Sequence, residues 1–437
     1  MIHKKVNIML KKIMTTVTAM LIMLSTGITV YENEPDIYED EPNTYEDKPD
    51  TSDTIDTFIW RRVPVAEFPY YTILHSHEVG ITVDGMDIIN GESVPGAVYK
   101  DGRPWLDGLD TDGDIYINDE YIFYITLSGD SRIRTLIFNG TSLCIEGDGT
   151  LTAESIQPAN SIYYEAARTY EPSMTLTVRE NASVIGTDTP ETASELNRQI
   201  KVNDIAVKDN GHLKCDDIAG KQICLYDNAS VAAEHCSVDE IILADDSVME
   251  VRGDYGKYPG LDITDDLKSC IYKITNMEIR DNARLSAECN TTDYGIFCRS
   301  TGTDAQITIS GSGILDVSGS SGFGISAEKN YYSMIGMHDD SQVIINGFKV
   351  GLATRRLEIN GGTLKINSDG DALQINPKAL NYKRFGTGIY INGDAVSQSC
   401  DWLLDTSEDD NSFIALRSSQ TGSKLKDLSI TVKEKQQ

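Results

Sequence analysis

The chain has little positive charge. It carries 38 Lys and Arg against 68 Asp and Glu, so its formal net charge is −30 over 437 residues. Nucleic acids and anionic membranes attract proteins of the opposite sign, so this balance argues against both as partners. It also disfavours acidic polymers, unless a cation bridges the two surfaces.

The chain also lacks an N-terminal apolar run long enough to cross a bilayer comfortably. A Lys-rich start precedes the apolar segment 13–24, whereas a transmembrane helix needs about 20 apolar residues. This pattern is typical of a secretion signal. We therefore predict that residues 1–30 are a signal peptide, with a retained N-terminal anchor as the alternative, and that the protein is secreted or displayed on the cell surface.

Residues 31–57 have few apolar side chains. They form a degenerate, acidic heptad (YENEPDI, YEDEPNT, YEDKPDT) with proline at the fifth place of each copy. Proline interrupts a continuous helix, and an acidic segment of this composition has no apolar surface to bury. We expect an extended, disordered linker.

An eleven-residue unit recurs through most of the remaining chain. Its clearest copy is 223–233, ICLYDNASVAA, which reads apolar-x-apolar-x-acid-Asn-small-x-apolar-x-small. Alternation on each side of the centre predicts two short strands, and the central Asp or Asn predicts a turn between them. A ninth copy, 357–366, is one residue short; the second apolar residues of the eight full copies are Ile145, Val178, Val207, Leu225, Leu243, Ile279, Ile309 and Met337.

Two folds fit this unit, a β-hairpin and one bend of a parallel β-helix. The differences between those eight successive residue numbers are 33, 29, 18, 18, 36, 30 and 28. The shortest spacing is eighteen residues and the longer spacings vary, which favours one coil per repeat with insertions on one side. Hairpins in a sandwich would give shorter and more even spacing. We predict an all-β, right-handed parallel β-helix.

The unit also divides the chain. Residues 58–140 are apolar and aromatic without it, and we predict that they form an N-terminal cap and the first coil strands, which would cover an open sheet edge. The repeats then occupy residues 141–396. Residues 397–437 contain one alternating segment, 428–432, and are interpreted as a closing strand and tail.

Several of these units resemble a known group. LCIEGDGTLTA, ITISGSGILDV and LEINGGTLKI are similar to coils of secreted bacterial right-handed parallel β-helix proteins of the carbohydrate-binding domain-containing group, which share the pectin-lyase-like solenoid of polysaccharide lyases. ITVDGMDI at 81–88 resembles their first strands. SDGDALQI at 368–375 resembles their Gly-Asp-Gly-Ile turns, with Ala372 in place of the usual Gly. Over roughly residues 80–395, the resemblance implies secretion, glycan binding and frequent calcium binding, and it supplies no catalytic residue.

Two acidic turns are candidate calcium (Ca2+) sites. Asp110, Asp112 and Asp114 place three carboxylates on alternate residues around a glycine, as loops that bind hard cations require, although an EF-hand alignment fails at both ends. Asp369 and Asp371 flank a second glycine. An ordinary Asp–Gly turn is the alternative in both places.

The acidic residues at the repeat centres are a third candidate. In stacked coils these carboxylates would lie about 4.8 Å apart and repel by about 1 kcal/mol in water. We expect them either to fan outward or to hold a cation.

No catalytic residue can be selected from the sequence. The Gly-His-Gly and Arg-Ile-Lys motifs of polygalacturonase-like hydrolases are absent. A lyase would need a basic residue beside clustered aspartates; Lys365, Lys378, Lys383 and Arg384 lie near the second acidic turn and keep that alternative open.

Aromatic side chains are the better indication of a glycan surface, because sugar rings stack their C–H faces on flat side chains. The candidates are Tyr163, Tyr164, Tyr331, Tyr332 and Trp105, each of which could instead pack over the coil as a lid. We predict a monomeric extracellular polysaccharide-binding protein without turnover. The alternatives are a polysaccharide lyase or glycoside hydrolase acting on uronate-rich polymers, and a surface adhesin or structural protein.

Eight cysteines in an exported chain permit disulfides. The repeat phase argues against most of them, because Cys215 would face Ala233 and Cys224 would also lack a cysteine in phase. We expect mostly free thiols, with Cys289 and Cys298 as the one nearby pair that could be linked.

Overall fold

The structure, a computed structural model, describes fifteen segments of the chain. They are residues 80–89, 94–118, 122–139, 142–158, 174–187, 200–253, 269–289, 293–298, 305–327, 333–375, 388–391, 394–395, 402–406, 414–418 and 425–432. The predicted signal peptide and acidic linker lie outside them. The described part of the chain is all-β, with strands in two sheets and no helix. Accordingly, it contains no helix with the length and hydropathy needed to cross a membrane.

The smaller sheet, sheet B, has fourteen strands within the described residues. In chain order they are β3 (Ala97–Lys100), β4 (Arg103–Leu106), β6 (Ile122–Leu127), β8 (Ser142–Gly147), β10 (Thr175–Val178), β13 (Asp204–Val207), β15 (Gln222–Leu225), β17 (Glu240–Leu243), β20 (Asn276–Ile279), β23 (Ala305–Ile309), β26 (Ser333–Met337), β28 (Arg356–Ile359), β30 (Gly388–Ile391) and β31 (Asp394–Ala395).

The larger sheet, sheet A, has twenty strands in the same described part. They are β1 (Gly80–Val83), β2 (Met86–Asp87), β5 (Asp114–Asn118), β7 (Ser131–Asn139), β9 (Thr150–Pro158), β11 (Ser183–Gly186), β12 (Ile200–Lys201), β14 (His212–Ala219), β16 (Ser230–Ser237), β18 (Val248–Gly253), β19 (Ser269–Tyr272), β21 (Arg284–Cys289), β22 (Tyr294–Phe297), β24 (Ile314–Gly319), β25 (Phe323–Ser326), β27 (Gln342–Thr354), β29 (Gly362–Ile375), β32 (Trp402–Thr406), β33 (Ile414–Ser418) and β34 (Asp427–Val432).

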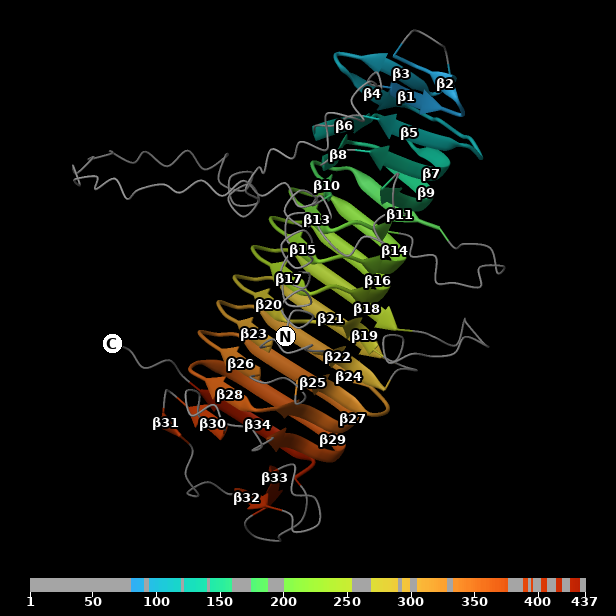
Figure 1. Ribbon diagram of the computed structural model, residues 1–437. Helices are drawn as coiled ribbons and strands as arrows, with labels where there is room; N and C mark the ends of the chain where they lie inside the picture. Colours follow the sequence, from blue (N-terminus) through green and yellow to red (C-terminus); the bar gives the residue numbers. More distant parts are fainter. Residues whose placement is uncertain are drawn as a thin grey trace, which may run out of the picture. The chain divides into compact units, whose positions relative to one another are not determined.

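Through the repeats the chain alternates between the two sheets, and each strand pairs in parallel with its equivalent one repeat away (Figure 1). We call one passage through sheet B and then sheet A a rung. Leu225 of β15 is the Cα partner of Val207 in β13 and of Leu243 in β17, both eighteen residues away. The register holds across the longer steps too, since Leu243 pairs with Ile279 of β20. The eleven-residue unit therefore marks one rung, and the hairpin alternative is wrong because the two strands of a unit belong to different sheets.

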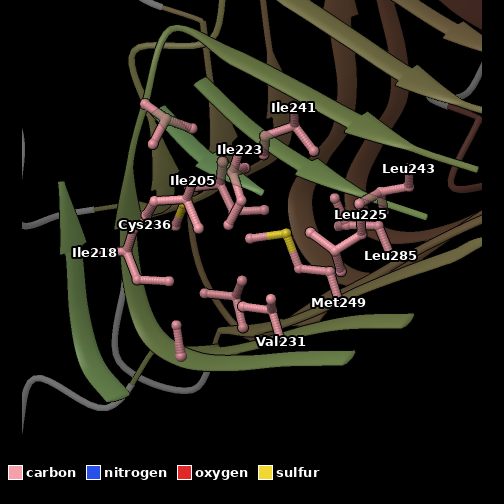
Figure 2. Close-up of a cluster of buried hydrophobic side chains, with 14 of the residues drawn as sticks. Ile205, Ile218, Ile223, Leu225, Val231, Cys236, Ile241, Leu243, Met249 and Leu285 are labelled. Atoms are coloured by element: carbon pink, nitrogen blue, oxygen red, sulfur yellow. The ribbon is translucent and has the colours of Figure 1, made fainter. Parts of the chain in front are cut away.

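The apolar positions of the unit form columns of buried side chains between the sheets. Ile205, Ile223 and Ile241 stack from sheet B, while Val231 and Met249 approach from sheet A (Figure 2). All five are at most 1 % exposed. Each side chain therefore packs against its own repeat and both neighbours, which makes every rung dependent on the next for its core.

The unit turns from one sheet to the other at a left-handed residue. In the eight full copies this residue has a positive φ, close to +60° in all but Gly147. The small residue of the unit comes two positions later, where a Cβ on Gly211 would lie 2.7 Å from the Val178 carbonyl oxygen. Aspartate and asparagine tolerate this backbone region better than most residues with a Cβ. The left-handed residues, one per copy, are Gly147, Glu180, Asp209, Asp227, Asp245, Asp281, Gly311 and Asp339.

The corner carboxylates accept hydrogen bonds from the backbone of the neighbouring rung. The Asp227 backbone N–H donates to Oδ2 of Asp245 at 3.1 Å, and the Asp209 N–H donates to Oδ2 of Asp227 at 3.1 Å. Beside them, the Asn228 amide donates to Oδ1 of Asn210 at 3.2 Å. The Asp227 and Asp245 carboxylates thus each accept a hydrogen bond from a backbone amide of the preceding rung, and a cation at the corners stays a prediction.

Antiparallel strands cover both ends of the parallel stacks. β1 pairs antiparallel with β5, and β3 with β4, before parallel pairing begins between β4 and β6 and between β5 and β7. Parallel pairing therefore begins within residues 58–140, the segment in which the cap and first coil strands were predicted. At the other end the predicted closing strand is present as β34, which lies antiparallel to β29. Pairing at both ends shields strand edges that would otherwise be open.

A column of glycines in sheet A lies where the backbones of neighbouring rungs approach closely. Gly295, Gly324 and Gly351 occupy equivalent positions of β22, β25 and β27. A Cβ placed on Gly324 would lie 2.5 Å from the Gly351 carbonyl oxygen and 2.5 Å from Cγ2 of Ile345. The backbone of the next rung fills the space that a side chain would need.

Substituting Gly324 by alanine should therefore destabilise the protein by about 1–3 kcal/mol through overpacking. Gly336 is the matched control, because a Cβ there would meet only Nε2 of His338, at 3.5 Å. Urea denaturation of both variants measures the difference. Equal midpoints for Gly324→Ala and Gly336→Ala would contradict the packing argument.

The structure corrects the cysteine prediction. The disulfide joins Cys270 to Cys289, with their Cα atoms 6.2 Å apart, and not Cys289 to Cys298. Cys298 is a buried free thiol, as are Cys144, Cys215, Cys224 and Cys236. The predicted neighbours of two thiols are confirmed. Cys215 is the Cα partner of Ala233, and Cys224 is the Cα partner of Ala206 and Ile242, so neither pairs with a cysteine.

Candidate functional site

Only one of the five predicted glycan-binding aromatics can be placed. Trp105 lies on β4 and is half-buried. The other four are tyrosines outside the described residues: Tyr163, Tyr164, Tyr331 and Tyr332. The surroundings of Trp105 therefore form the best-defined candidate site.

Trp105 belongs to a group on the outer face of sheet B, at the N-terminal end of the repeats, where β4, β6, β8 and β10 follow one another (Figure 1). Phe123, Ile125 and Leu127 point into the core, so the alternate residues of β6 face outward. We call this group the N-terminal cluster; it consists of Arg103, Trp105, Tyr124, Thr126, Glu146 and Arg179.

The register of sheet B builds the cluster from residues that are distant in sequence. Thr126 is the Cα partner of Trp105 in β4 and of Glu146 in β8, so these three side chains follow one another along the outer face. Arg179 comes directly after β10, whose Val178 pairs with Ile145 of β8. Neighbouring rungs lie about 4.8 Å apart, which brings all four side chains within reach of one ligand.

A buried carboxylate holds the two arginines of the cluster. Both Arg103 and Arg179 form ion pairs with Glu146, and Nε of Arg179 donates to Glu146 Oε2 at 2.9 Å. The Glu146 side chain is only 6 % exposed, whereas those of Arg103 and Arg179 are 35 % and 30 % exposed. The carboxylate therefore lies beneath the guanidinium groups, which extend toward solvent.

Cations also lie over the aromatic rings of the cluster. Cζ of Arg103 is 5.0 Å from the centroid of the Tyr124 ring, and Cζ of Arg179 is 5.6 Å from it. Nζ of Lys100 is 5.0 Å from the Trp105 ring. These distances are within the range of cation–π attraction, which restrains the flexible side chains before any ligand arrives.

Two buried polar atoms of the cluster have no hydrogen-bond partner in the described structure. They are Nε1 of Trp105 and Oγ1 of Thr126, and Thr126 is only 7 % exposed. An unsatisfied buried group of this kind costs about 1–3 kcal/mol, and such groups are few in native proteins. A ligand with hydroxyl groups could supply the missing partners.

The nearby thiol does not add a nucleophile. Cys144 pairs with Tyr124 across β6 and β8 and is 4 % exposed. Burial raises the pKa of the Cys144 thiol to about 12. The thiolate is the reactive form, so Cys144 acts as a small packing residue at neutral pH.

The first predicted calcium turn is engaged by arginines of the next strand. Arg132 of β7 donates to Asp110 at 2.8 Å and forms an ion pair with Asp112 at 2.9 Å. Hydrogen bonding by Arg134 lowers the pKa of Asp114 below its ordinary value. Within the residues that the structure describes, no group of three or more metal-ligating side chains is placed to hold an ion. The donor set fits guanidinium groups, and calcium at this turn stays a prediction.

The second predicted calcium turn is divided by an irregularity in the pairing of β27 with β29. Asp369 is exposed, whereas Asp371 is 5 % exposed and its Oδ2 accepts a hydrogen bond from Gln374 at 3.0 Å. The two carboxylates therefore lie in different environments. Of the bases considered for a lyase, Lys365 is exposed on β29, and the others (Lys378, Lys383, Arg384) lie outside the described residues.

A second aromatic group lies on sheet A. Tyr294 stacks on Phe323 with ring centroids 5.5 Å apart, and Tyr272 stacks on Phe297 at 5.8 Å. Tyr272 and Phe297 are at most 6 % exposed, and only Tyr294 and Phe323 are partly open to solvent. Because each ring covers its neighbour, this group packs the rungs together, and it leaves less ring surface for a ligand.

Sequence reasoning found Trp105 and missed the rest of the N-terminal cluster. Its other members come from β4, β6 and β8 and from the residue after β10; β4 and β6 precede the recognisable repeats, and β8 begins them. The stacking of the coils could have indicated them, because outward residues at equivalent positions of successive rungs lie next to one another.

No family model matches the chain, and neither curated proteins nor solved structures give a significant match to it.

Proposed function

We propose that this chain is an extracellular polysaccharide-binding protein that does not turn its ligand over, built as a right-handed parallel β-helix, and that the N-terminal cluster is its binding site. The observation that carries the proposal is the half-buried Trp105 ring beside two unsatisfied buried polar atoms, its own Nε1 and Oγ1 of Thr126.

The chemistry of the cluster suits a saccharide. Sugars combine apolar C–H faces with hydroxyl groups that both donate and accept hydrogen bonds. A tryptophan ring offers apolar area for the first, while the indole N–H and a threonine hydroxyl offer partners for the second. The guanidinium groups of Arg103 and Arg179 add further donors at the rim of the site.

The acid of the cluster is poorly placed for hydrolysis. A general acid must present its proton to the leaving oxygen within hydrogen-bond reach. Both carboxylate oxygens of Glu146 accept hydrogen bonds from arginines, and its side chain is 6 % exposed. This supports binding without turnover over the hydrolase alternative.

Thr126→Val is the sharpest test of the binding site. Removing an unsatisfied hydroxyl while keeping the side-chain shape should leave the free protein as stable or more stable, yet weaken glycan binding about threefold to tenfold if the hydroxyl contacts the ligand. Trp105→Ala should cost tenfold or more, roughly the effect of losing an aromatic anchor. Binding is measured on a glycan array and by affinity electrophoresis, and stability by thermal unfolding.

Tyr116→Ala is the control, because Tyr116 is an exposed aromatic residue on β5 of the other sheet. Its binding should equal that of the wild type. Unchanged binding by both cluster variants would exclude this site. Parallel incubations with chelator test the calcium prediction, and ultraviolet absorbance of new double bonds in uronate polymers tests the lyase alternative.

A further inference from the structure

We propose that the N-terminal cluster recognises an anionic substituent of its glycan, a carboxylate, sulfate ester or phosphate ester, held by Arg103 and Arg179. This inference rests on the proposed function, which does not itself require the glycan to be charged.

The first argument is the local charge. Two guanidinium groups share the single carboxylate of Glu146, so this part of the cluster carries an excess of one positive charge. The ammonium of Lys100 lies over the Trp105 ring but is paired with Asp101 at 4.0 Å, so the excess charge comes from the two arginines. The whole chain has a net charge of −30, so a cationic site on its surface contrasts with the rest of the molecule.

The second argument is the number of donors left over. A guanidinium carries five N–H groups in a planar fork. The hydrogen bonds to Glu146 use Nη1 of Arg103, and Nε and Nη2 of Arg179. Nε and Nη2 of Arg103 and Nη1 of Arg179 remain for a ligand. Paired guanidinium forks of this kind match the geometry of planar and tetrahedral oxyanions.

The third argument is preorganisation. Glu146 fixes both arginines from below, and the Tyr124 ring lies within 5.0 Å and 5.6 Å of their Cζ atoms. The arginines therefore lose less side-chain freedom on binding than exposed, unattached arginines would. One arginine would be enough for a purely structural ion pair with Glu146, whereas the second leaves positive charge and N–H donors exposed.

The negative net charge of the chain suppresses non-specific binding to anionic polymers in the test. A protein with a charge of −30 is repelled by polyanions at long range, so retention by an anionic polymer reports a specific site. Affinity electrophoresis in gels containing dextran, dextran sulfate, hydroxyethyl cellulose or carboxymethyl cellulose compares neutral and charged forms of two backbones. Free phosphate, added as a competitor, tests whether the site binds a phosphate group in place of a carboxylate or a sulfate.

The decisive variants change the charge of the cluster in opposite directions. Arg103→Gln and Arg179→Gln should each weaken binding to the anionic polymer about tenfold, as expected for loss of a charge-assisted hydrogen bond. Glu146→Gln should strengthen that binding, because it removes the competing carboxylate. A change that merely loosens the fold would weaken binding in all three variants. Arg134→Gln, which removes an arginine paired with Asp114 on sheet A, is the matched control and should bind as the wild type does.

Retention of the wild type by a charged polymer, with these opposite effects, supports the inference and identifies the anion. Equal retention by neutral and charged polymers, with no effect of the arginine variants, overturns it and leaves the proposed function intact, provided Trp105→Ala still weakens binding. If neither class of polymer, nor any glycan on the array, is retained by the wild type, the proposed function itself fails.

Discussion

Substituting His235 by alanine is expected to destabilise the protein by about 3 kcal/mol, because it removes one partner of a buried hydrogen-bonded pair and opens a cavity. His235 on β16 and Asp217 on β14 are Cα partners in neighbouring rungs, and Nδ1 of His235 lies 2.9 Å from Oδ1 of Asp217. Their exposures are 4 % and 7 %. The alanine variant would leave the Asp217 carboxylate buried without its imidazole.

The surroundings explain why this loss should be large. Burial raises the pKa of the nearby thiols Cys215 and Cys236, and the Asp217 carboxylate adds to that shift. The loss should be large because both members of the pair are buried in the sheet beside these thiols. The double variant Asp217→Leu/His235→Leu should therefore recover much of the stability, since replacing both members with apolar groups removes the desolvation penalty.

His212→Ala is the control for the histidine substitution. His212 is half-buried on the same β14, and its Nδ1 lies 2.7 Å from Oγ of Ser230. Losing one such hydrogen bond should cost only about 1 kcal/mol. Thermal and urea unfolding compare the variants. The buried-pair account is contradicted if His235→Ala is as stable as His212→Ala, or if the double leucine variant is the least stable of the three.

Loss of the Cys270–Cys289 disulfide should cost about 3 kcal/mol, from the entropy that a link across a loop of this size removes from the unfolded chain. The two cysteines are 19 residues apart in sequence and join β19 to β21 of the next rung. Reduction should therefore lower the unfolding temperature of the wild type. Peptide mapping without reduction should recover the two cysteines in one linked peptide.

Single substitutions show whether the link itself matters. Cys270→Ser and Cys289→Ser should each remove the whole effect, so the double variant should be no less stable than either single variant by more than a few tenths of a kcal/mol. Reductant should no longer destabilise any of them. Cys298→Ser is the control. Cys298 is a buried free thiol, so this variant keeps the disulfide and reductant should still destabilise it. Additive losses in the double variant would argue against a disulfide.

The sequence predicts the repeat register well, because one side-chain pattern is repeated at every rung. Aligning Leu225 with Val207 and Leu243 needs only the unit itself, and the structure pairs the same residues. The corner is predictable for the same reason. Few residue types tolerate a positive φ, and the crowded position two residues later accepts only a small side chain. Periodicity thus identifies the strands, the faces and the parallel pairing.

Residues outside the unit are harder to place. Cys270 follows the excess residues of the longest repeat step, and its neighbours in the next rung cannot be counted from the unit. The structure pairs Ser269 with Tyr294, which brings Cys270 close to Cys289. The N-terminal cluster was missed for a related reason, since Arg103 and Tyr124 precede the first copy of the unit and have no repeat phase to align.

The eighteen-residue rung has a consequence for how this molecule can change in size. Residues 204–221 and 222–239 are successive rungs with the same register, so gaining or losing one such block would leave every inward residue inward. Whole rungs can therefore be added or removed while the N-terminal cluster and the terminal strands keep their own neighbours.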